Sequence, residues 1–184
     1  MKIDYRNSLG FVLALLIPLL ILGGIAYKPL VAKAQGEEIL LATDAYDPRD
    51  LFRGDYVHLN LEISRATYDL LSKEIFYNTE KYNDSFVYVL LKIDQNGYHS
   101  IDTVLEKPPS EGVYLKARIS GLRETSGFQK SYSVYLNYGL ERYYVQENTG
   151  EELQYDSNDG ILDVVVRTYK GYGYVERLRK RDAE

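Results

Sequence analysis

An uncharged stretch near the N-terminus, Leu9 to Tyr27, places the strongest constraint on how this chain can fold. About twenty apolar residues in one helix suffice to cross the hydrocarbon core of a bilayer, which is roughly 30 Å thick. Lys2 and Arg6 precede the stretch, and positively charged flanks stay on the cytoplasmic side. We therefore expect a single transmembrane anchor at the cell membrane, with everything after it folded outside the cytoplasm.

A cleaved secretory signal is the alternative for the same segment. Ala32-Lys33-Ala34 has the small-x-small form of a cleavage site, so cleavage after Ala34 stays open. The uncharged core is longer than the roughly 7 to 15 residues usual in cleaved signals, which favours an uncleaved anchor. The predicted organisation is a cytoplasmic N-terminus, the anchor, a linker, one exported domain and a charged tail, at residues 1–8, 9–27, 28–37, 38–178 and 179–184.

Composition excludes several classes of partner and site. The chain carries a net charge of −5, which gives a nucleic acid no electrostatic footprint. It has no cysteine, so it forms neither disulfides nor thiolate metal sites. Its two histidines, His58 and His99, lie on different predicted strands without the spacing of a zinc site. The segment 156–160 comes nearest to a calcium loop but is better explained as a turn. We predict no cofactor and no metal.

The exported part, about 150 residues, has the length of one compact domain, and its hydrophobic pattern is mostly of period two. Apolar residues alternate from Val57 to Ile63, which predicts a long strand with one buried face. Asn96-Gly97 predicts a tight hairpin, because both residues tolerate the positive φ angles of such turns. The strands joined by this hairpin and the further strands are predicted at 86–94, 98–105, 38–43, 113–119, 132–136, 162–169 and 174–178.

Helices are few in this pattern. Tyr68, Leu71 and Ile75 recur at helical spacing, so a short helix is expected within 65–84. The segment 140–153 is interpreted as a second helical turn or a loop, because the alternation fails there. The predicted fold class is mainly β with one or two short helices (β or α+β), an antiparallel β-rich exported domain behind a single N-terminal transmembrane helix.

A turn precedes the first long strand. Pro48 presets the φ angle of the turn, Asp50 can cap a helical turn that runs to Arg53, and Gly54 can end it in the left-handed conformation. A structural role explains these residues best. The functional alternative is a polar site at the strand entrance.

The ten residues Gly54 to Ile63 resemble the signature of the bacterial GDYXXLXYXI family, membrane-anchored proteins of uncharacterised function. The sequence departs at Leu61, where the family string has tyrosine, so an inward apolar position is kept and a hydroxyl is lost. Segments 47–53 and 137–144 also resemble the family. The resemblance implies a neighbourhood with multi-span membrane proteins. The candidate binding residues are Asp50, Arg53, Gly54, Asp55, Tyr56, His58, Glu141 and Arg142.

Two functional hypotheses follow. The first is a non-catalytic accessory or binding subunit of a membrane complex. The alternative is a membrane-surface hydrolase or transferase that uses Asp55, Glu141 or Glu147 as its carboxylates. Gly54 to Val57 is also similar to the Gly-Asp-x-Val strand of membrane-anchored signal peptidases, but no serine lies between Gln35 and Asp55 to act as their nucleophile. We therefore assign no catalytic residue from the sequence.

Overall fold

The computed structural model describes residues 5–45, 56–125, 131–146 and 150–181 of the 184-residue chain. Four of the predicted site residues, Asp50, Arg53, Gly54 and Asp55, lie outside the described residues. The turn predicted at 47–54 lies outside them too.

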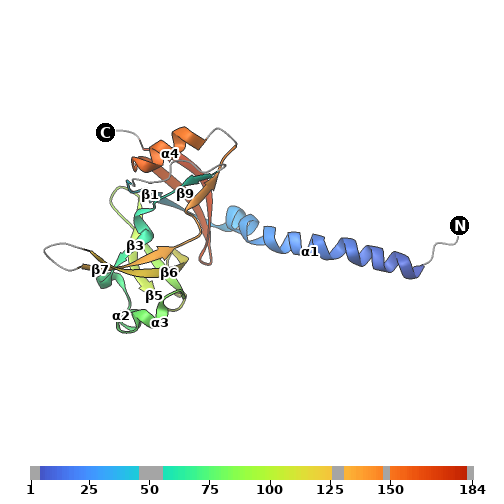
Figure 1. Cartoon of the computed structure of the whole chain (residues 1–184), viewed down its shortest axis with the longest axis horizontal. Coiled ribbons are helices and arrows are strands. Elements are labelled where there is room, and N and C mark those ends of the chain that lie inside the picture. The colour runs from blue at the N-terminus through green and yellow to red at the C-terminus, as the bar shows by residue number, and fades with distance from the viewer. Residues whose placement is uncertain (1–4, 46–55, 126–130, 147–149, 182–184) are drawn as a thin grey trace.

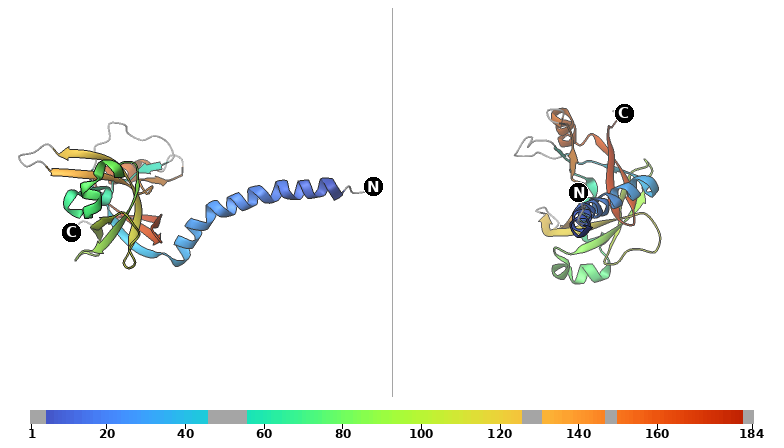
Figure 2. Two further views of the ribbon diagram at one scale, coloured as in Figure 1. Left: turned by 90° about the horizontal axis from the view of Figure 1, so that it is seen from below. Right: turned by 90° about the vertical axis from the view of Figure 1, so that its right-hand side faces the viewer.

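A long N-terminal helix, α1 (Tyr5–Gln35), projects away from a β-rich domain (Figures 1 and 2). Gly10–Gln35 is long and apolar enough to cross a membrane, and its large apolar side chains between Phe11 and Ile25 are exposed. The helix is thus a candidate membrane span or signal anchor, as the sequence indicated. It continues to Gln35, so most of the segment predicted as a linker, 28–37, is helical.

Within the described residues, the domain consists of three antiparallel sheets. The first has the order β1-β9-β10, with β1 Glu37–Ala42, β9 Leu162–Tyr169 and β10 Tyr172–Lys180. The second is a ribbon of β2 (Tyr56–His58) and β8 (Arg142–Tyr144). The third has the order β3-β7-β6-β4-β5, with β3 Arg65–Thr67, β7 Ser131–Asn137, β6 Tyr114–Thr125, β4 Phe86–Ile93 and β5 His99–Leu105.

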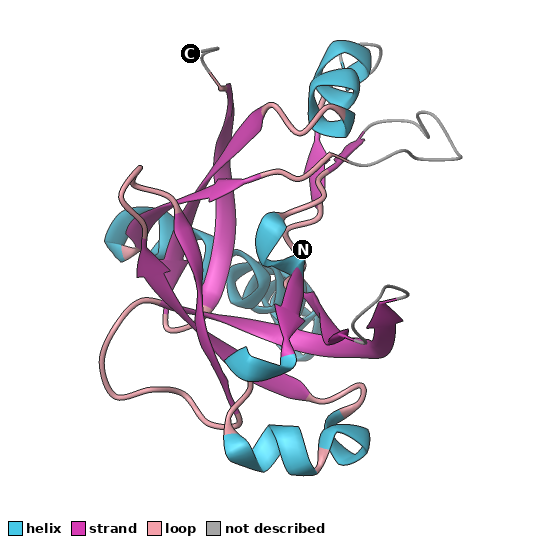
Figure 3. Ribbon diagram, turned by 90° about the vertical axis from the view of Figure 1, so that its left-hand side faces the viewer, coloured by secondary structure: helices cyan, strands magenta, loops and turns pink. Residues whose placement is uncertain are grey.

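One hydrophobic core joins the three sheets. Its fully buried side chains come from each of them, for example Ile39 and Val166, Val57, and Val89 and Ile119. Short helices lie at the two ends of the domain: α2 (Lys73–Tyr77) and α3 (Thr79–Tyr82) at one, α4 (Gly150–Asn158) at the other (Figures 1 and 3). The predicted antiparallel β-rich fold with short helices behind an N-terminal apolar helix is confirmed.

The predicted hairpin of β4 and β5 is present, but its turn is wider than a two-residue turn. Only Gly97 has a positive φ angle, +84°, and Asn96 does not. The carboxylate of Asp94 accepts hydrogen bonds from the backbone N–H groups of Asn96 and Tyr98, which closes the longer loop. The side chain of Asp94 therefore stabilises this turn, and a positive φ angle at Asn96 does not.

Three expectations for the other segments were wrong in detail. The alternation from Val57 to Ile63 is not one strand: β2 ends at His58, and 62–64 forms a 3₁₀ turn. Leu59, Leu61 and Ile63 are nonetheless buried, because alternation reports burial and not strand pairing. The helix expected within 65–84 is divided into β3, a 3₁₀ turn at 68–70, α2 and α3, since Leu71 bridges to Val104 and Ser72 starts α2 afresh.

The third difference concerns the C-terminal half. The segment 140–153 contains β8 and the start of α4, and α4 includes most of the predicted turn at 156–160. Strand β10 runs to Lys180, into the predicted charged tail. Arg179 and Lys180 form ion pairs with Asp163 and Asp156, so these charges are docked on the domain.

Candidate functional site

The β2–β8 ribbon brings the two candidate segments of the sequence together. Tyr56 pairs with Tyr144 and His58 pairs with Arg142. Because side chains alternate along a strand, these four share one face of the ribbon. Val57, on the opposite face, is fully buried in the core. The ribbon therefore has an inner face that belongs to the fold and an outer face that is available for contacts.

The outer face, which we call the ribbon face (Tyr56, His58, Arg142 and Tyr144), combines aromatic rings with a cation. The ring centroids of Tyr56 and Tyr144 are 6.1 Å apart at an interplanar angle of 59°. The guanidinium of Arg142 lies 5.4 Å from the centroid of the Tyr56 ring. Tyr144 is 72% exposed. The rings thus support one another at the surface while much of their area stays accessible to a partner.

Helix α4 closes the other edge of β2. The side-chain amide of Gln154 accepts a hydrogen bond from the backbone N–H of His58 at 2.8 Å and donates to its carbonyl at 3.4 Å. The hydroxyl of Ser157 donates to the same carbonyl at 2.8 Å. These bonds satisfy backbone groups that an open strand edge would leave exposed. A partner would therefore meet the side chains of the ribbon face and not the edge of β2 at His58.

Glu141 supports the ribbon from the turn before β8. Its carboxylate accepts a hydrogen bond from the backbone N–H of Tyr138, and its carbonyl accepts one from Leu59. The hydroxyl of Tyr138 donates to the carbonyl of Ile63 at 2.8 Å. Burial raises the pKa of Tyr138 well above its usual value, so this hydroxyl keeps its proton. Glu141 thus holds the backbone of the turn that leads into Arg142.

His58 is the titratable group of the ribbon face. Burial lowers its pKa, the carboxylate of Glu141 opposes this shift, and Arg142 adds to it. The imidazole is therefore neutral at pH 7, and the fixed positive charge of this face belongs to Arg142.

A protein-family model described as "GDYXXLXY protein" matches residues 18–178. The chain belongs to the GDYXXLXY family. Searches of curated proteins and of solved structures returned no significant match.

The described residues that correspond to the GDYXXLXY string lie in two different environments. Tyr56 lies on the ribbon face, whereas Leu59 and Leu61 are buried in the core. At the string's last position this family member has Leu61 in place of tyrosine, within a packed apolar environment and bridged to Thr43. The exchange therefore concerns packing and leaves the ribbon face unchanged.

The structure brings together the described site residues but gives them unequal roles. Tyr56, His58 and Arg142 share the ribbon face, while Glu141 lies beside it as a support. Sequence reasoning missed Tyr144, Gln154 and Ser157. Tyr144 follows Arg142 at the spacing of a strand and could have been found; the two α4 residues gave no local signal.

A second polar cluster surrounds a buried carboxylate. The side chain of Asp163 is 1% exposed and pairs with Arg179 at 2.8 Å and Arg181 at 3.1 Å. The hydroxyl of Tyr98 donates to it at 2.9 Å. Burial alone would raise the pKa of Asp163, but hydrogen bonds from these three partners outweigh it, and the pKa lies below its usual value. This cluster ties β10 and the β4–β5 hairpin to β9.

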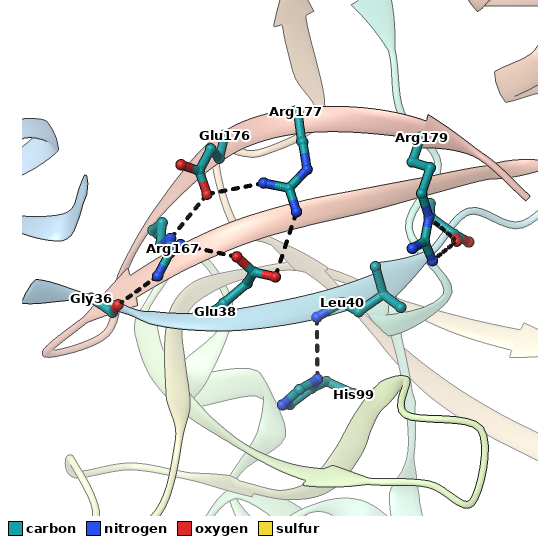
Figure 4. A network of polar contacts seen from close by, with 9 residues as sticks. Gly36, Glu38, Leu40, His99, Arg167, Glu176, Arg177 and Arg179 are labelled. Carbon is teal, nitrogen blue, oxygen red and sulfur yellow. Dashed lines mark hydrogen bonds and ion pairs between the residues drawn. The ribbon is translucent and has the colours of Figure 1, made fainter. Parts of the chain in front are cut away.

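A third cluster lies where α1 enters the domain (Figure 4). Arg167 on β9 donates to the carboxylates of Glu176 at 2.9 Å and Glu38 at 3.0 Å, and to the carbonyl of Gly36 at 3.4 Å. Arg177 completes the network, 3.6 Å from Glu38 and 3.5 Å from Glu176. The hydrogen bond from Arg167 is the main cause that lowers the pKa of Glu176. The network fixes the end of the helix to the first sheet.

Metal ligation finds no support in these clusters. Within the described part of the chain, no group of three His, Cys, Asp or Glu side chains is placed to hold a metal ion.

Proposed function

We propose that this GDYXXLXY family member is a membrane-anchored, extracytoplasmic accessory subunit that binds a partner protein of the same membrane through the ribbon face. The observation that carries the proposal is the outer face of the β2–β8 ribbon, where Tyr56, Arg142 and Tyr144 gather at the surface. The subunit acts by binding and performs no reaction itself.

The chemistry of the ribbon face suits protein recognition. Tyrosine and arginine are enriched among the residues that dominate the energetics of protein interfaces. Tyrosine gives large contact area at low entropic cost, because it has few rotatable bonds. Arg142 is held over the ring of Tyr56, so less freedom is lost when it binds. A partner that offers an apolar surface and a carboxylate for Arg142 would fit this face.

The anchor supports a partner in the same membrane. A span at Gly10–Gln35 would confine the domain to the membrane surface, which raises its effective concentration toward other membrane proteins. A multi-span membrane protein with an exposed extracytoplasmic loop is therefore the partner that we propose.

The hydrolase or transferase alternative gains no support from the described residues. The carboxylate of Glu141 accepts the backbone N–H of Tyr138 and so has a place in the turn. The other two carboxylates of that hypothesis, Asp55 and Glu147, lie outside the described residues. We therefore develop only the binding hypothesis.

The test is a pull-down of the tagged full-length protein from detergent-solubilised native membranes. The variant Arg142→Ser/Tyr144→Ser removes one cation and one ring from the ribbon face. The matched control Tyr77→Ser/Lys107→Ser likewise removes one ring and one cation, from exposed positions elsewhere. Near-ultraviolet circular dichroism of each variant checks that the fold is intact.

We expect a multi-span protein to be recovered in near-equal amount with the wild type and with the control, and to be lost with the ribbon variant. Equal recovery with both folded variants would place the contact elsewhere. Recovery of no membrane protein with the wild type would contradict the accessory role.

A further inference from the structure

The anchor helix is joined to the first strand of the domain by a very short connection. Helix α1 ends at Gln35, Gly36 donates its N–H to the carbonyl of Ala32, and β1 begins at Glu37. Lys28 marks the end of the uncharged stretch, and from there to Gln35 a helix rises about 10–12 Å. The headgroup region adds only about 5–8 Å on each side of the hydrocarbon core. If α1 spans the membrane, the domain therefore begins within a few ångströms of the headgroups.

One hairpin then turns back toward the C-terminal end of α1. Strand β1 leads away from the helix, and β9 runs antiparallel to it, with Thr168 opposite Glu37. The tip of the β9–β10 hairpin, Lys170-Gly171, lies two residues beyond Thr168, or about 7 Å further toward the helix. Figure 1 and the left view of Figure 2 both place this red hairpin beside the C-terminal end of α1.

The hairpin tip is rigid. Lys170 and Gly171 both have positive φ angles, +49° and +81°, the geometry of a tight two-residue turn whose twist matches the strands. The carbonyl of Gly171 accepts the N–H of Lys116 at 2.8 Å, and a side chain at this glycine would collide with the ring of Tyr114. The tip is thus held in place by β6.

Three tyrosines surround the tip on one face of the sheet. Tyr172 pairs with Tyr169, and Tyr174 follows two positions later on the same face. Lys170 at the tip is exposed, and its ammonium lies 5.3 Å from the ring of Tyr169. Tyrosine is enriched at the level of lipid headgroups, where its ring meets apolar surface and its hydroxyl meets water. Lysine extends its charge to the phosphates.

Charges near the tip favour anionic headgroups. Lys28, Lys33 and Lys170 are exposed on this side. Glu38 and Glu176 are neutralised by Arg167 and Arg177, in the network of Figure 4. Glu37 is the one exposed carboxylate that remains in this group, so the local balance is positive although the chain as a whole is negative.

We infer that the β9–β10 hairpin, through Tyr169, Lys170, Tyr172 and Tyr174, docks into the headgroup layer of the membrane that α1 crosses and binds its anionic lipids there. The inference rests on the membrane anchoring within the proposed function. Docking fixes the tilt of the domain, because the helix and the hairpin together give two points of attachment.

The absence of cysteine makes the test direct, since a single introduced cysteine carries a single label. Full-length protein is labelled with a fluorophore at Tyr172→Cys and reconstituted in bilayers of anionic and zwitterionic phospholipids. Lipids brominated near the top of the acyl chains serve as quenchers for positions 172 and 155, and lipids brominated near the ends of the chains serve for position 17. Tyr155→Cys, an exposed tyrosine on α4, is the matched control, and Ile17→Cys reports whether α1 spans the bilayer.

We expect quenching at positions 17 and 172 and none at 155. The added change Lys170→Glu should reduce the quenching at 172 in anionic bilayers. Quenching at 17 but not at 172 would overturn the docking and leave the anchor intact. Loss of quenching at both would overturn the anchoring itself, and with it the proposed function. Equal quenching at 172 and 155 would contradict a specific hairpin contact.

Discussion

The buried carboxylate of Asp163 offers a quantitative test of how the domain is held together. The change Asp163→Asn keeps the volume and one acceptor oxygen, so the hydrogen bond from Tyr98 can persist. It removes the negative charge that faces Arg179 and Arg181. Two guanidinium groups would then point at a buried neutral amide.

The magnitude follows from the exposure of the partners. A hydrogen bond to a charged group contributes about 1.5–3 kcal/mol, but less where water can replace it. The side chains of Arg179 and Arg181 are 59% and 35% exposed, so both are partly rehydrated in the variant. We therefore expect a loss of about 2 kcal/mol in the free energy of unfolding. For a chain of this length that corresponds to a decrease in Tm of about 4–8 °C.

The matched control is Asp102→Asn, which removes a carboxylate from the surface. Asp102 is 43% exposed and lies 3.7 Å from Lys92, which is 57% exposed, so its loss should cost less than about 0.5 kcal/mol. Near-ultraviolet circular dichroism follows unfolding, because 17 of the 19 tyrosines follow α1 in the sequence and only Tyr5 and Tyr27 lie in the micelle-bound helix. Equal Tm values for the two variants would refute the reasoning.

The pH dependence gives a second readout of the same variant. The pKa of Asp163 is lower in the folded state than its unfolded value of about 3.9, so its contribution is complete above that value. The contribution is lost as the pH falls through the folded pKa. The stability difference between wild type and Asp163→Asn should therefore be constant near neutrality and shrink in strong acid. A difference that persists there would contradict an ionic origin.

Two further perturbations test the junction with α1 and the edge of β1 that does not pair with β9. In Gly36→Ala, the added Cβ would overlap the carbonyl oxygen of Ala32 and lie 3.0 Å from that of Thr168, so we expect a loss of about 1–3 kcal/mol in urea unfolding. Gly24→Ala, with nothing within 4 Å, should cost nothing, and equal costs would contradict this account. His99 accepts the N–H of Leu40 through Nδ1, and burial lowers its pKa, so stability should fall as the pH drops below about 6.5. His99→Gln should reduce this slope in urea unfolding but not abolish it, because the pKa of His58 is lowered as well; an unchanged slope would show that His99 does not cause it.

The sequence predicted the elements whose signals are local. The β4–β5 hairpin and the valine-rich strand β9 were found within a residue or two of their bounds, since each lies within one short window. The helix expected at 65–84 failed, because the bridge of Leu71 to Val104 competes with helical propensity and the sequence gives no sign of it. The turn at 156–160 failed in the same way, as α4 packs on β2 and is stabilised there.

The sequence indicated which residues belong to the candidate site, but it did not indicate how they are arranged. The string that begins at Gly54 indicated Tyr56 and His58, and segment 137–144 indicated Arg142, but their pairing on one ribbon depends on the folded chain. Gln154 lies 96 residues from the backbone that it caps, and Tyr98 lies 65 residues from Asp163. Such contacts have no local signature.

By itself, the sequence determined the apolar helix, the β-rich class and the family, because hydrophobic length, alternation and a short string are properties of neighbouring residues. The tertiary structure alone decided which charges are buried, which rings share the ribbon face, and that the β9–β10 hairpin lies beside α1. Those relations follow from sheet order and register. These are set by how distant apolar faces pack into one core, and a local pattern cannot specify which distant partner it will meet.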